Sequence, residues 1–293
     1  MDIRILQYYL TVAREENITR AAQSLHLTQP TLSRQMMQLE EELGVQLFVR
    51  GRRSIFLTED GMLFKRRAQE IVSLAEKAVQ ELNTQSPVSG EIAVGGGELL
   101  AFSWLAGAMT AFRREYPLVR FHLQSGNADV VKEGIERGLI DVGLVLVPVD
   151  IGKYDFLEVP GEETWGVYVH EDLPLAQRQS AAKDDLLGEK ILMTRRELVQ
   201  SAISRWFGTE YEQLRIIGTY DLLGNAAVLV QQKAGIAVGL ARNCTYDHVR
   251  FLPFSPPLTA NTMLIWKKGQ SVSPAVGAFV EYAQKYKNRM VQD

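Results

Sequence analysis

The stretch of residues 17–61 constrains the fold more than any other part of the chain. Two short helical patterns lie close together in it, and a turn rich in arginine follows them. Thr19 is in position to cap a helix over residues 20–26, where Ala21 and Ala22 are small enough to let another helix approach closely.

A second helix is predicted for residues 29–43. Thr28 caps it, Pro30 falls in the first turn, where a missing N–H costs little, and Gly44 ends it in the left-handed region. Apolar residues recur at helical spacing and define its buried face: Leu32, Met36, Leu39 and Leu43. The other side carries polar groups that can reach bases and phosphates: Thr31, Arg34 and Gln38, with Gln29 and Ser33 near the helix start. The pattern predicts a helix-turn-helix whose second helix enters the major groove of DNA.

The alternative is an amphipathic helix pair in an ordinary core, and the next residues favour DNA. Leu47 and Phe48 are typical of a buried strand, and Arg50, Arg52 and Arg53 then concentrate positive charge on one turn. A basic turn beside a groove-binding helix is placed to neutralise the flanking phosphates. We therefore interpret this turn as the wing of a winged helix-turn-helix, rather than as a merely solvated loop.

These residues resemble a known family. The match runs without a gap over about sixty residues: Ala21-Ala22, Leu25, Thr28 to Arg34, Leu39-Glu40, Glu42-Leu43-Gly44, Leu47-Phe48, Arg50, Leu57-Thr58 and Gly61. It is similar to the signature of LysR-type transcriptional regulators. The resemblance implies a winged helix-turn-helix, a long linker helix and an α/β effector domain with two lobes, like a periplasmic binding protein. It further implies that Gln29, Thr31, Ser33 and Arg34 contact the major groove, and that Arg50, Arg52 and Arg53 contact phosphates.

Bulk composition is compatible with this resemblance but does not establish it. The chain has 293 residues, is 46% hydrophobic and 23% charged, and has a net charge of −3, as in an ordinary soluble protein of two or three domains. Residues 1–67 contain ten Lys or Arg against eight Asp or Glu. Because the excess is small, DNA binding must depend on where the charges are placed.

Several classes of site are not expected. The single cysteine, Cys244, excludes an internal disulfide and fits a reducing cytoplasm. The histidines are scattered without metal-ligand spacing, no nucleotide-binding or nucleophile motif is present, and we expect no metal and no cofactor. No apolar run is long enough to span a membrane, and the N-terminus lacks the features of a signal peptide. We therefore expect a cytoplasmic protein that does not bind membranes.

A long helical pattern begins at Gly61 and continues to about Thr84. Apolar residues in it alternate spacings of four and three: Phe64, Ala68, Ile71, Ala75, Ala78 and Leu82. The alternative is a helix face that packs on its own domain, but a domain of sixty residues has little surface to cover so long a helix. We favour a homodimer seam, which would hold two recognition helices at the spacing of a DNA site with dyad symmetry. The resemblance also implies a homotetramer and contact with RNA polymerase.

The remaining chain alternates strand and helix patterns after a linker at residues 85–90, which predicts an α/β doubly wound fold. In the first set, strands are expected at 91–94, 119–124 and 141–147, a tight glycine turn at 95–97, and helices at 99–116 and 128–137. In the second set, strands are expected at 165–169, 190–193, 216–220, 235–240 and 263–266, and helices at 198–207, 225–233 and 275–286. We expect a DNA-binding domain (1–61), a linker helix (62–86) and an effector domain (87–293). By resemblance, lobe I of the effector domain spans 91–160 and 263–293 and lobe II spans 161–262, with crossovers near 160–161 and 259–262.

Ligands of such folds bind beyond the carboxyl ends of the strands, near helix N-termini that favour anions. The candidate effector-binding residues occupy those turns: Gly97, Glu98, Leu99, Ser125, Asn127, Val147, Thr194, Arg195 and Asn225. In LysR-type proteins the first turn often carries a hydroxyl group that contacts the effector, whereas this chain has Gly97 and Leu99 there. Glu98 would oppose a carboxylate effector unless Arg195 or Arg196 compensates.

Two other functions remain open. One is a DNA-binding regulator that does not respond to an effector. The other is an enzyme on the two-lobed fold, for which Glu98 with Arg195 is the only catalytic pair that the sequence suggests. We expect a small-molecule effector to bind the cleft and shift how the dimers sit on double-stranded DNA.

Overall fold

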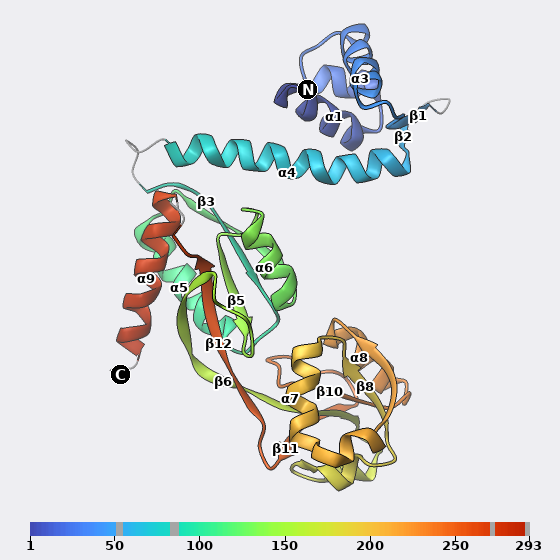
Figure 1. Ribbon diagram of the computed structural model, residues 1–293, viewed down its shortest axis with the longest axis vertical. Coiled ribbons are helices and arrows are strands. Elements are labelled where there is room, and N and C mark those ends of the chain that lie inside the picture. The colour runs from blue at the N-terminus through green and yellow to red at the C-terminus, as the bar shows by residue number, and fades with distance from the viewer. Residues whose placement is uncertain (51–54, 83–87, 270–272, 291–293) are drawn as a thin grey trace. The chain divides into compact units, whose positions relative to one another are not determined.

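The structure is a computed structural model that describes residues 1–50, 55–82, 88–269 and 273–290. The chain divides into two compact units, Met1–Gln85 and Ser86–Asp293 (Figure 1). Each unit has its own hydrophobic core and is described by itself.

Three helices form the body of the N-terminal unit: α1 (Ile3–Glu15), α2 (Ile18–Ser24) and α3 (Gln29–Leu43). The cap of α3 is as predicted, since the Thr28 side chain accepts from the Thr31 amide and Gly44 is left-handed with φ of 69°. The predicted start of α2 was wrong. Asn17, not Thr19, caps this helix by accepting from the Arg20 amide, so the helix begins two residues earlier.

The core of this unit lies where the three helices meet. Its fully buried residues come from all three helices and from the segment after α3: Leu6, Tyr9, Val12, Ala21, Ala22, Leu32, Met36, Leu39 and Leu47. On α1, Leu6, Tyr9 and Val12 face this core, whereas Ile3 is exposed. The two alanines of α2 are fully covered, which agrees with the close helix approach that their size allows.

A two-stranded antiparallel hairpin follows α3. It pairs β1 (Phe48–Arg50) with β2 (Ile55–Leu57), and Phe48 lies opposite Leu57. One carboxylate oxygen of Glu40 accepts from the amides of Leu47 and Phe48 at 2.7 and 3.0 Å, which fixes the start of the hairpin to α3. The hairpin is therefore the wing expected from the sequence.

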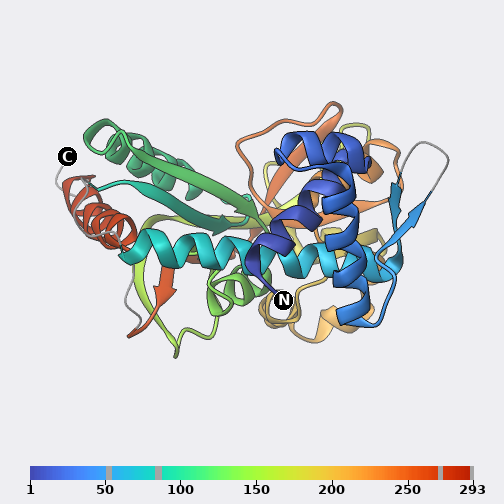
Figure 2. The same ribbon diagram turned by 90° about the horizontal axis from the view of Figure 1, so that it is seen from above.

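The long helix α4 (Glu59–Leu82) follows the wing, and Figure 2 shows it as one uninterrupted helix. It begins before the predicted residue: Thr58 caps it by accepting from the Gly61 amide at 2.9 Å, so Gly61 lies in its first turn. A Cβ atom at Gly61 would collide with the Leu47 carbonyl, and the Tyr9 hydroxyl donates to the Gly61 carbonyl at 2.6 Å. Gly61 thus allows the first turn of α4 to pack directly against the core of the N-terminal unit.

The predicted dimer seam on α4 divides into two parts. Ala68 and Val72 are buried in the core of the N-terminal unit and Phe64 packs against it, so this part of the seam is internal. Other apolar side chains of α4 are exposed: Leu63, Ile71, Leu74 and Val79. The first half of the seam prediction was therefore wrong, because α4 lies along α1 and covers the helix-turn-helix core with that face.

The C-terminal unit is built on one mixed sheet with the strand order β4-β3-β5-β12-β6-β10-β8-β9. At one end β3 (Gly90–Gly96), β4 (Val119–Ser125) and β5 (Val142–Leu146) are parallel, and β12 (Thr259–Lys267) pairs antiparallel with β5. The helices α5 (Phe102–Glu115), α6 (Ala128–Glu136) and α9 (Pro274–Met290) pack on these strands. This group is lobe I.

Lobe II occupies the other end of the sheet. Here β8 (Lys190–Thr194) is parallel to β9 (Arg215–Tyr220) and to β10 (Ile236–Leu240), and β10 pairs antiparallel with β6 (Tyr154–His170). The helices are α7 (Glu197–Phe207) and α8 (Leu223–Gln231). The smaller elements are η1 (Pro174–Gln177), β7 (Ala181–Ala182), η2 (Lys183–Leu186), η3 (Gly208–Gln213) and β11 (Val249–Ser255).

Only β6 and β12, among the strands of the described residues, run through both lobes, side by side (Figure 1). Their antiparallel ladder extends from Tyr154 opposite Lys267 to Thr164 opposite Thr259, with a register shift between Ala260 and Thr262. Several sequence predictions differ from this arrangement. The strands expected at 165–169 and 263–266 begin earlier, at Tyr154 and Thr259. Gly95 and Gly96 belong to β3 rather than to a turn, α5 begins at Phe102 rather than Leu99, and β11 was not predicted. Pro253 within β11 weakened its strand pattern, since proline is disfavoured in sheets.

Replacing Gly61 by Ala should destabilise the N-terminal unit by ~1–3 kcal/mol, because the new methyl group meets backbone that cannot move independently. Thermal unfolding followed by circular dichroism measures the change. Met62→Ala is the control at the next, exposed position and should change stability by less than ~0.5 kcal/mol. Equal stability of both variants would contradict the close approach.

Candidate functional site

The exposed face of α3 carries the polar residues that the sequence suggested for DNA. Gln29, Thr31, Arg34 and Gln38 are exposed, while Ser33 is half-buried. The Gln29 amide donates to the Ser33 hydroxyl at 2.9 Å, and the hydroxyl groups of Thr28 and Thr31 lie 2.7 Å apart. These contacts orient short polar groups at the N-terminal end of the helix, which in a helix-turn-helix approaches the bases.

The wing lies directly after this helix in the chain. Arg50 ends β1, but its side chain, like Arg52 and Arg53 as whole residues, lies outside the described residues. Two of the three acids near the end of α3 have structural partners. Glu40 holds the wing, and Glu42 pairs with the N-terminal amine at 2.7 Å. Their charge is therefore partly compensated within the unit.

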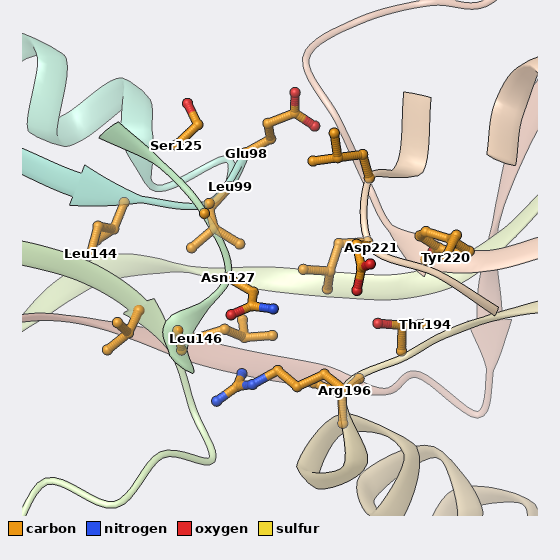
Figure 3. Close-up of a pocket in the computed structure, with 18 of the residues that line it drawn as sticks. Glu98, Leu99, Ser125, Asn127, Leu144, Leu146, Thr194, Arg196, Tyr220 and Asp221 are labelled. Carbon is orange, nitrogen blue, oxygen red and sulfur yellow. The ribbon is translucent and has the colours of Figure 1, made fainter. Parts of the chain in front are cut away.

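The second candidate site is a cavity of about 140 Å³ between the lobes of the C-terminal unit. The strand-end turns of both lobes meet there (Figure 3). Its apolar walls are Leu99, Leu144, Leu146, Trp165, Val199, Leu222 and Leu240. Polar groups of its lining are Ser125, Asn127, Thr194 and Tyr220, and charged groups are Glu98, Arg196, Asp221 and Arg242. A mainly apolar cavity with a few polar groups is the usual form of a small-molecule site.

The structure brings most of the predicted effector residues to this cavity. Gly97, Glu98, Leu99, Ser125, Asn127 and Thr194 line it. Val147 instead lines a neighbouring cavity beside Pro148, Arg195 projects outward with 72% of its side chain exposed, and Asn225 is an exposed residue of α8. These three do not line the main cavity. In the loop before α8, the residues that line it are Tyr220, Asp221 and Leu222.

The N-terminus of α5 cannot serve as the anion site that its position suggested. The fully buried carboxylate of Glu163 on β6 accepts from the amides of Leu100 and Ala101 at 3.0 and 2.8 Å. The neighbouring Leu99 and Phe102 amides donate to the Gly97 and Leu99 carbonyls. These amides are thus occupied by the protein itself, and a ligand must find its donors elsewhere.

Two arginines of lobe II reach the cavity with donors that have no hydrogen-bond partner. Arg196, at the start of α7, is 8% exposed, and Arg242, just after β10, is 15% exposed. The buried Nε of Arg196 and the buried Nε and Nη1 of Arg242 have no acceptor within hydrogen-bond distance. Burial lowers the pKa of the Arg196 guanidinium, but an arginine remains charged at neutral pH.

Both arginines face carboxylates of lobe I. Arg196 lies 3.6 Å from Asp129 in the first turn of α6, and its Nη2 donates weakly to the Pro148 carbonyl at 3.4 Å. Arg242 lies 3.7 Å from Glu98. The sequence-based pairing of Glu98 with Arg195 was wrong, because Arg195 pairs with Asp221 at 3.3 Å on its own lobe. The suggested catalytic pair is therefore not assembled.

Comparison with known proteins decides the family. Residues 3–62 match the model of the bacterial regulatory helix-turn-helix protein, lysR family, and residues 85–287 match that of the LysR substrate binding domain. The chain belongs to the LysR family. Its fold and function are thus those of a DNA-binding transcription regulator with an effector-binding substrate domain.

Relatives of this LysR-family protein, and solved structures that are similar to it, agree with the assignment. The chain is 30% identical over 293 residues to the Hca operon transcriptional activator HcaR of Escherichia coli, covering 97% of this chain and 98% of the relative. It is 38% identical over 161 residues to the regulator BsdA of Bacillus subtilis, covering 54% and 55% of the two chains. Full-length CbnR, solved in complex with its target DNA, has the same fold with a TM-score of 0.72 at 22% identity, over 98% of this chain and 100% of that one.

Sequence reasoning missed several lining residues of the cleft of this regulator, among them Arg242, and it also missed Glu163, which holds α5 without lining the cavity. Arg242 directly follows the apolar strand predicted at residues 235–240, so the rule that ligands lie beyond the carboxyl ends of strands could have found it. Glu163 has no such signal, because it is one of two adjacent glutamates in a strand and only the tertiary structure places it under α5.

None of the helices in the described part of the chain combines the length and the apolar character that a membrane span requires.

Glu163→Ala should destabilise the C-terminal unit of this regulator by ~1–3 kcal/mol, because two buried amides lose their acceptor. All four tryptophans lie in that unit, so urea unfolding followed by tryptophan fluorescence reports its stability alone. Glu162→Ala removes the same charge at the adjacent, exposed position and should have little effect. Equal midpoints for the two variants would show that Glu163 does not cap α5.

Proposed function

We propose that this LysR-family regulator reads DNA with α3 and contacts the flanking phosphates with the wing. The observation that carries this proposal is the exposed polar face of α3, which is followed in the chain by two paired strands with Arg52 and Arg53 between them in the sequence. Gln29, Thr31, Ser33, Arg34 and Gln38 are the proposed major-groove residues, and Arg50, Arg52 and Arg53 the proposed phosphate contacts. Arg34 is the strongest candidate for reading a base, since a guanidinium fits the guanine edge with two hydrogen bonds.

We also propose a separate function for each part of the chain. Residues 1–61 bind DNA, 62–86 form the linker helix, and 87–293 bind the effector, with lobe I at 91–160 and 263–293 and lobe II at 161–262. The effector would act in the cavity between the lobes, on Ser125, Asn127 and Thr194 among its lining residues. The LysR-family relatives are regulators, which supports a regulator rather than an enzyme. A tetramer, contact with RNA polymerase and a cytoplasmic location are further parts of the proposal.

The exposed stripe of α4 is the proposed dimer surface. Leu63, Ile71, Leu74 and Ala78 are exposed and recur at helical spacing, next to the face that covers the core. Large apolar side chains gathered on one exposed face of a helix indicate an interaction surface. A second copy of α4 would cover them and bring two α3 helices to a site with dyad symmetry.

The DNA proposal is tested by footprinting the regulator on the DNA upstream of its own gene, at two salt concentrations. We expect a protected site with dyad symmetry that is lost as salt rises, because bound phosphates release counterions. Absence of protection on this DNA and on a genomic fragment library would contradict the proposal.

Arg34→Ala should weaken binding to the protected site by ~1–3 kcal/mol and reduce its preference over unrelated DNA. Mobility-shift titrations on both DNAs measure the two quantities. Arg14→Ala removes an exposed arginine of α1 and is the control for charge alone. If both variants weaken both DNAs equally, Arg34 does not read a base.

Leu74→Glu should weaken the dimer by ~2 kcal/mol, because it places a charge where an apolar side chain would be buried. DNA affinity should fall with it. Ser73→Glu adds the same charge at an exposed position on another face of the helix and is the matched control. Sedimentation velocity measures the association, and an unchanged dimer in the Leu74 variant would refute this surface.

A further inference from the structure

We propose that the effector of this regulator carries a carboxylate, which binds Arg242 by taking the place of Glu98. The inference rests on the proposed function, since it assigns a chemical class to the ligand of the cleft between the lobes. It also assigns a consequence to binding, because Glu98 belongs to lobe I and Arg242 to lobe II.

The first step is the supply of hydrogen-bond donors around the cavity. The first amides of α5 are taken by Glu163 and by backbone carbonyls, and the Asp129 and Val130 amides of α6 are taken by the Asn127 side chain. These two helix starts therefore offer little to an anion. Arg242 contributes two buried nitrogens without an acceptor, Nε and Nη1, and Arg196 contributes one.

The second step is how loosely Glu98 holds Arg242. Their closest atoms are 3.7 Å apart, beyond hydrogen-bond distance, and 62% of the Glu98 side chain is exposed. A carboxylate that is well solvated and does not complete a hydrogen bond is readily exchanged for another. A ligand carboxylate inside the cavity can approach Arg242 to hydrogen-bond distance and form the stronger, charge-assisted bonds.

The third step is the position of the pair. Glu98 and Arg242 line the central cavity and also a second cavity of about 530 Å³, which continues past Phe102, Ser103, Leu123 and Tyr246. Gly97, Leu99 and Ser125 are likewise shared by the two cavities. The ion pair thus lies between the two cavities. When a ligand carboxylate replaces Glu98, the rest of the ligand can extend from the central cavity into the second one.

The fourth step separates Arg242 from the other cationic groups. Arg196 is paired with Asp129 as loosely as Arg242 is with Glu98, at 3.6 Å, but its Nη2 also donates to the Pro148 carbonyl, and it has one buried nitrogen without an acceptor against two in Arg242. Figure 3 shows Arg196 at the opposite end of the pocket from Glu98. Arg195 projects outward and pairs with Asp221. Arg242 is therefore the anchor for the carboxylate, and Arg196 closes the far end of the cavity.

The exchange couples binding to the arrangement of the lobes. On this side of the cleft, lobe II contacts lobe I through Arg242 with Glu98 and through the Asn243 amide, which donates to the Ser103 hydroxyl at 3.1 Å. When a ligand carboxylate replaces Glu98, lobe II is linked to lobe I through the ligand instead. Such a ligand has different affinity for different lobe spacings, which is the requirement for an allosteric effector.

The test uses pairs of small molecules that differ only in charge. A cavity of about 140 Å³ is close to the ~150 Å³ that holds one benzene ring in another protein. Benzoate with benzamide, and cyclohexanecarboxylate with its amide, are therefore suitable probes. Calorimetry on the full-length protein at fixed ionic strength should show that at least one acid binds at least ~10-fold more tightly than its amide. If neither acid binds more tightly than its amide, the proposal is overturned.

Variants then test the exchange itself. Arg242→Gln should weaken binding of that acid at least ~10-fold, whereas Arg195→Gln, which removes the same charge from an exposed pair, should not. Glu98→Gln should tighten it, because the competing carboxylate is gone, whereas Glu91→Gln, which removes the same charge from an exposed ion pair of lobe I away from the cavity, should leave it nearly unchanged. Equal effects of Glu98→Gln and Glu91→Gln would show a general charge effect and overturn the proposal.

DNA binding separates this inference from the proposed function. Footprints of Glu98→Gln should resemble those of the wild-type protein saturated with the binding acid, since both lack the Glu98–Arg242 contact. A variant that still protects the site but gives the footprint of the ligand-free wild type would overturn the exchange while leaving the DNA-binding function intact. Loss of all protection in the wild-type protein would instead contradict the proposed function.

Discussion

The pairing of β6 with β12 is the constraint on which the C-terminal unit depends. Each lobe has its own hydrophobic core, and these two strands are the ones that run through both. Because a ladder of backbone hydrogen bonds joins these two strands along their length, the lobes are held together as parts of one sheet. The register shift between Ala260 and Thr262 places an irregularity within this ladder. The cavity lies where the strand ends of both lobes face each other.

The buried carboxylate of Glu163 gives β6 a second role besides joining the two lobes. Glu163 is on β6, opposite Ala260, and it holds the first turn of α5 in lobe I. This contact satisfies amides that would otherwise attract an anion, and so it changes the chemistry of the cleft. The charged donors that line the cavity belong to arginines of lobe II, which face the solvated carboxylates of lobe I. Ligand recognition and lobe contact therefore use the same charged groups.

The long helix α4 has two apolar faces with different surroundings. Ala68 and Val72 complete the core of the N-terminal unit, whereas Leu63, Ile71 and Leu74 stay exposed on an adjacent face. Gly61 makes the first role possible by letting the helix start lie against the Leu47 carbonyl. A heptad count alone merged these faces into one seam, because residues three or four apart lie on neighbouring sides of a helix whichever partner covers them.

The sequence by itself determined the parts that depend on local chemistry. Thr28, Pro30 and Gly44 fixed the recognition helix through capping and backbone preference, and the apolar runs located most of the strands, since these signals act within a few residues. Only the tertiary structure decided which charged groups meet. Glu98 faces Arg242 and Glu163 faces α5 across separations of 144 and 62 residues, and Arg195 turns outward while its neighbour Arg196 turns inward. Side-chain partners of this kind follow from how the strands are ordered in the sheet, and that order is set by packing of the whole domain rather than by any local pattern.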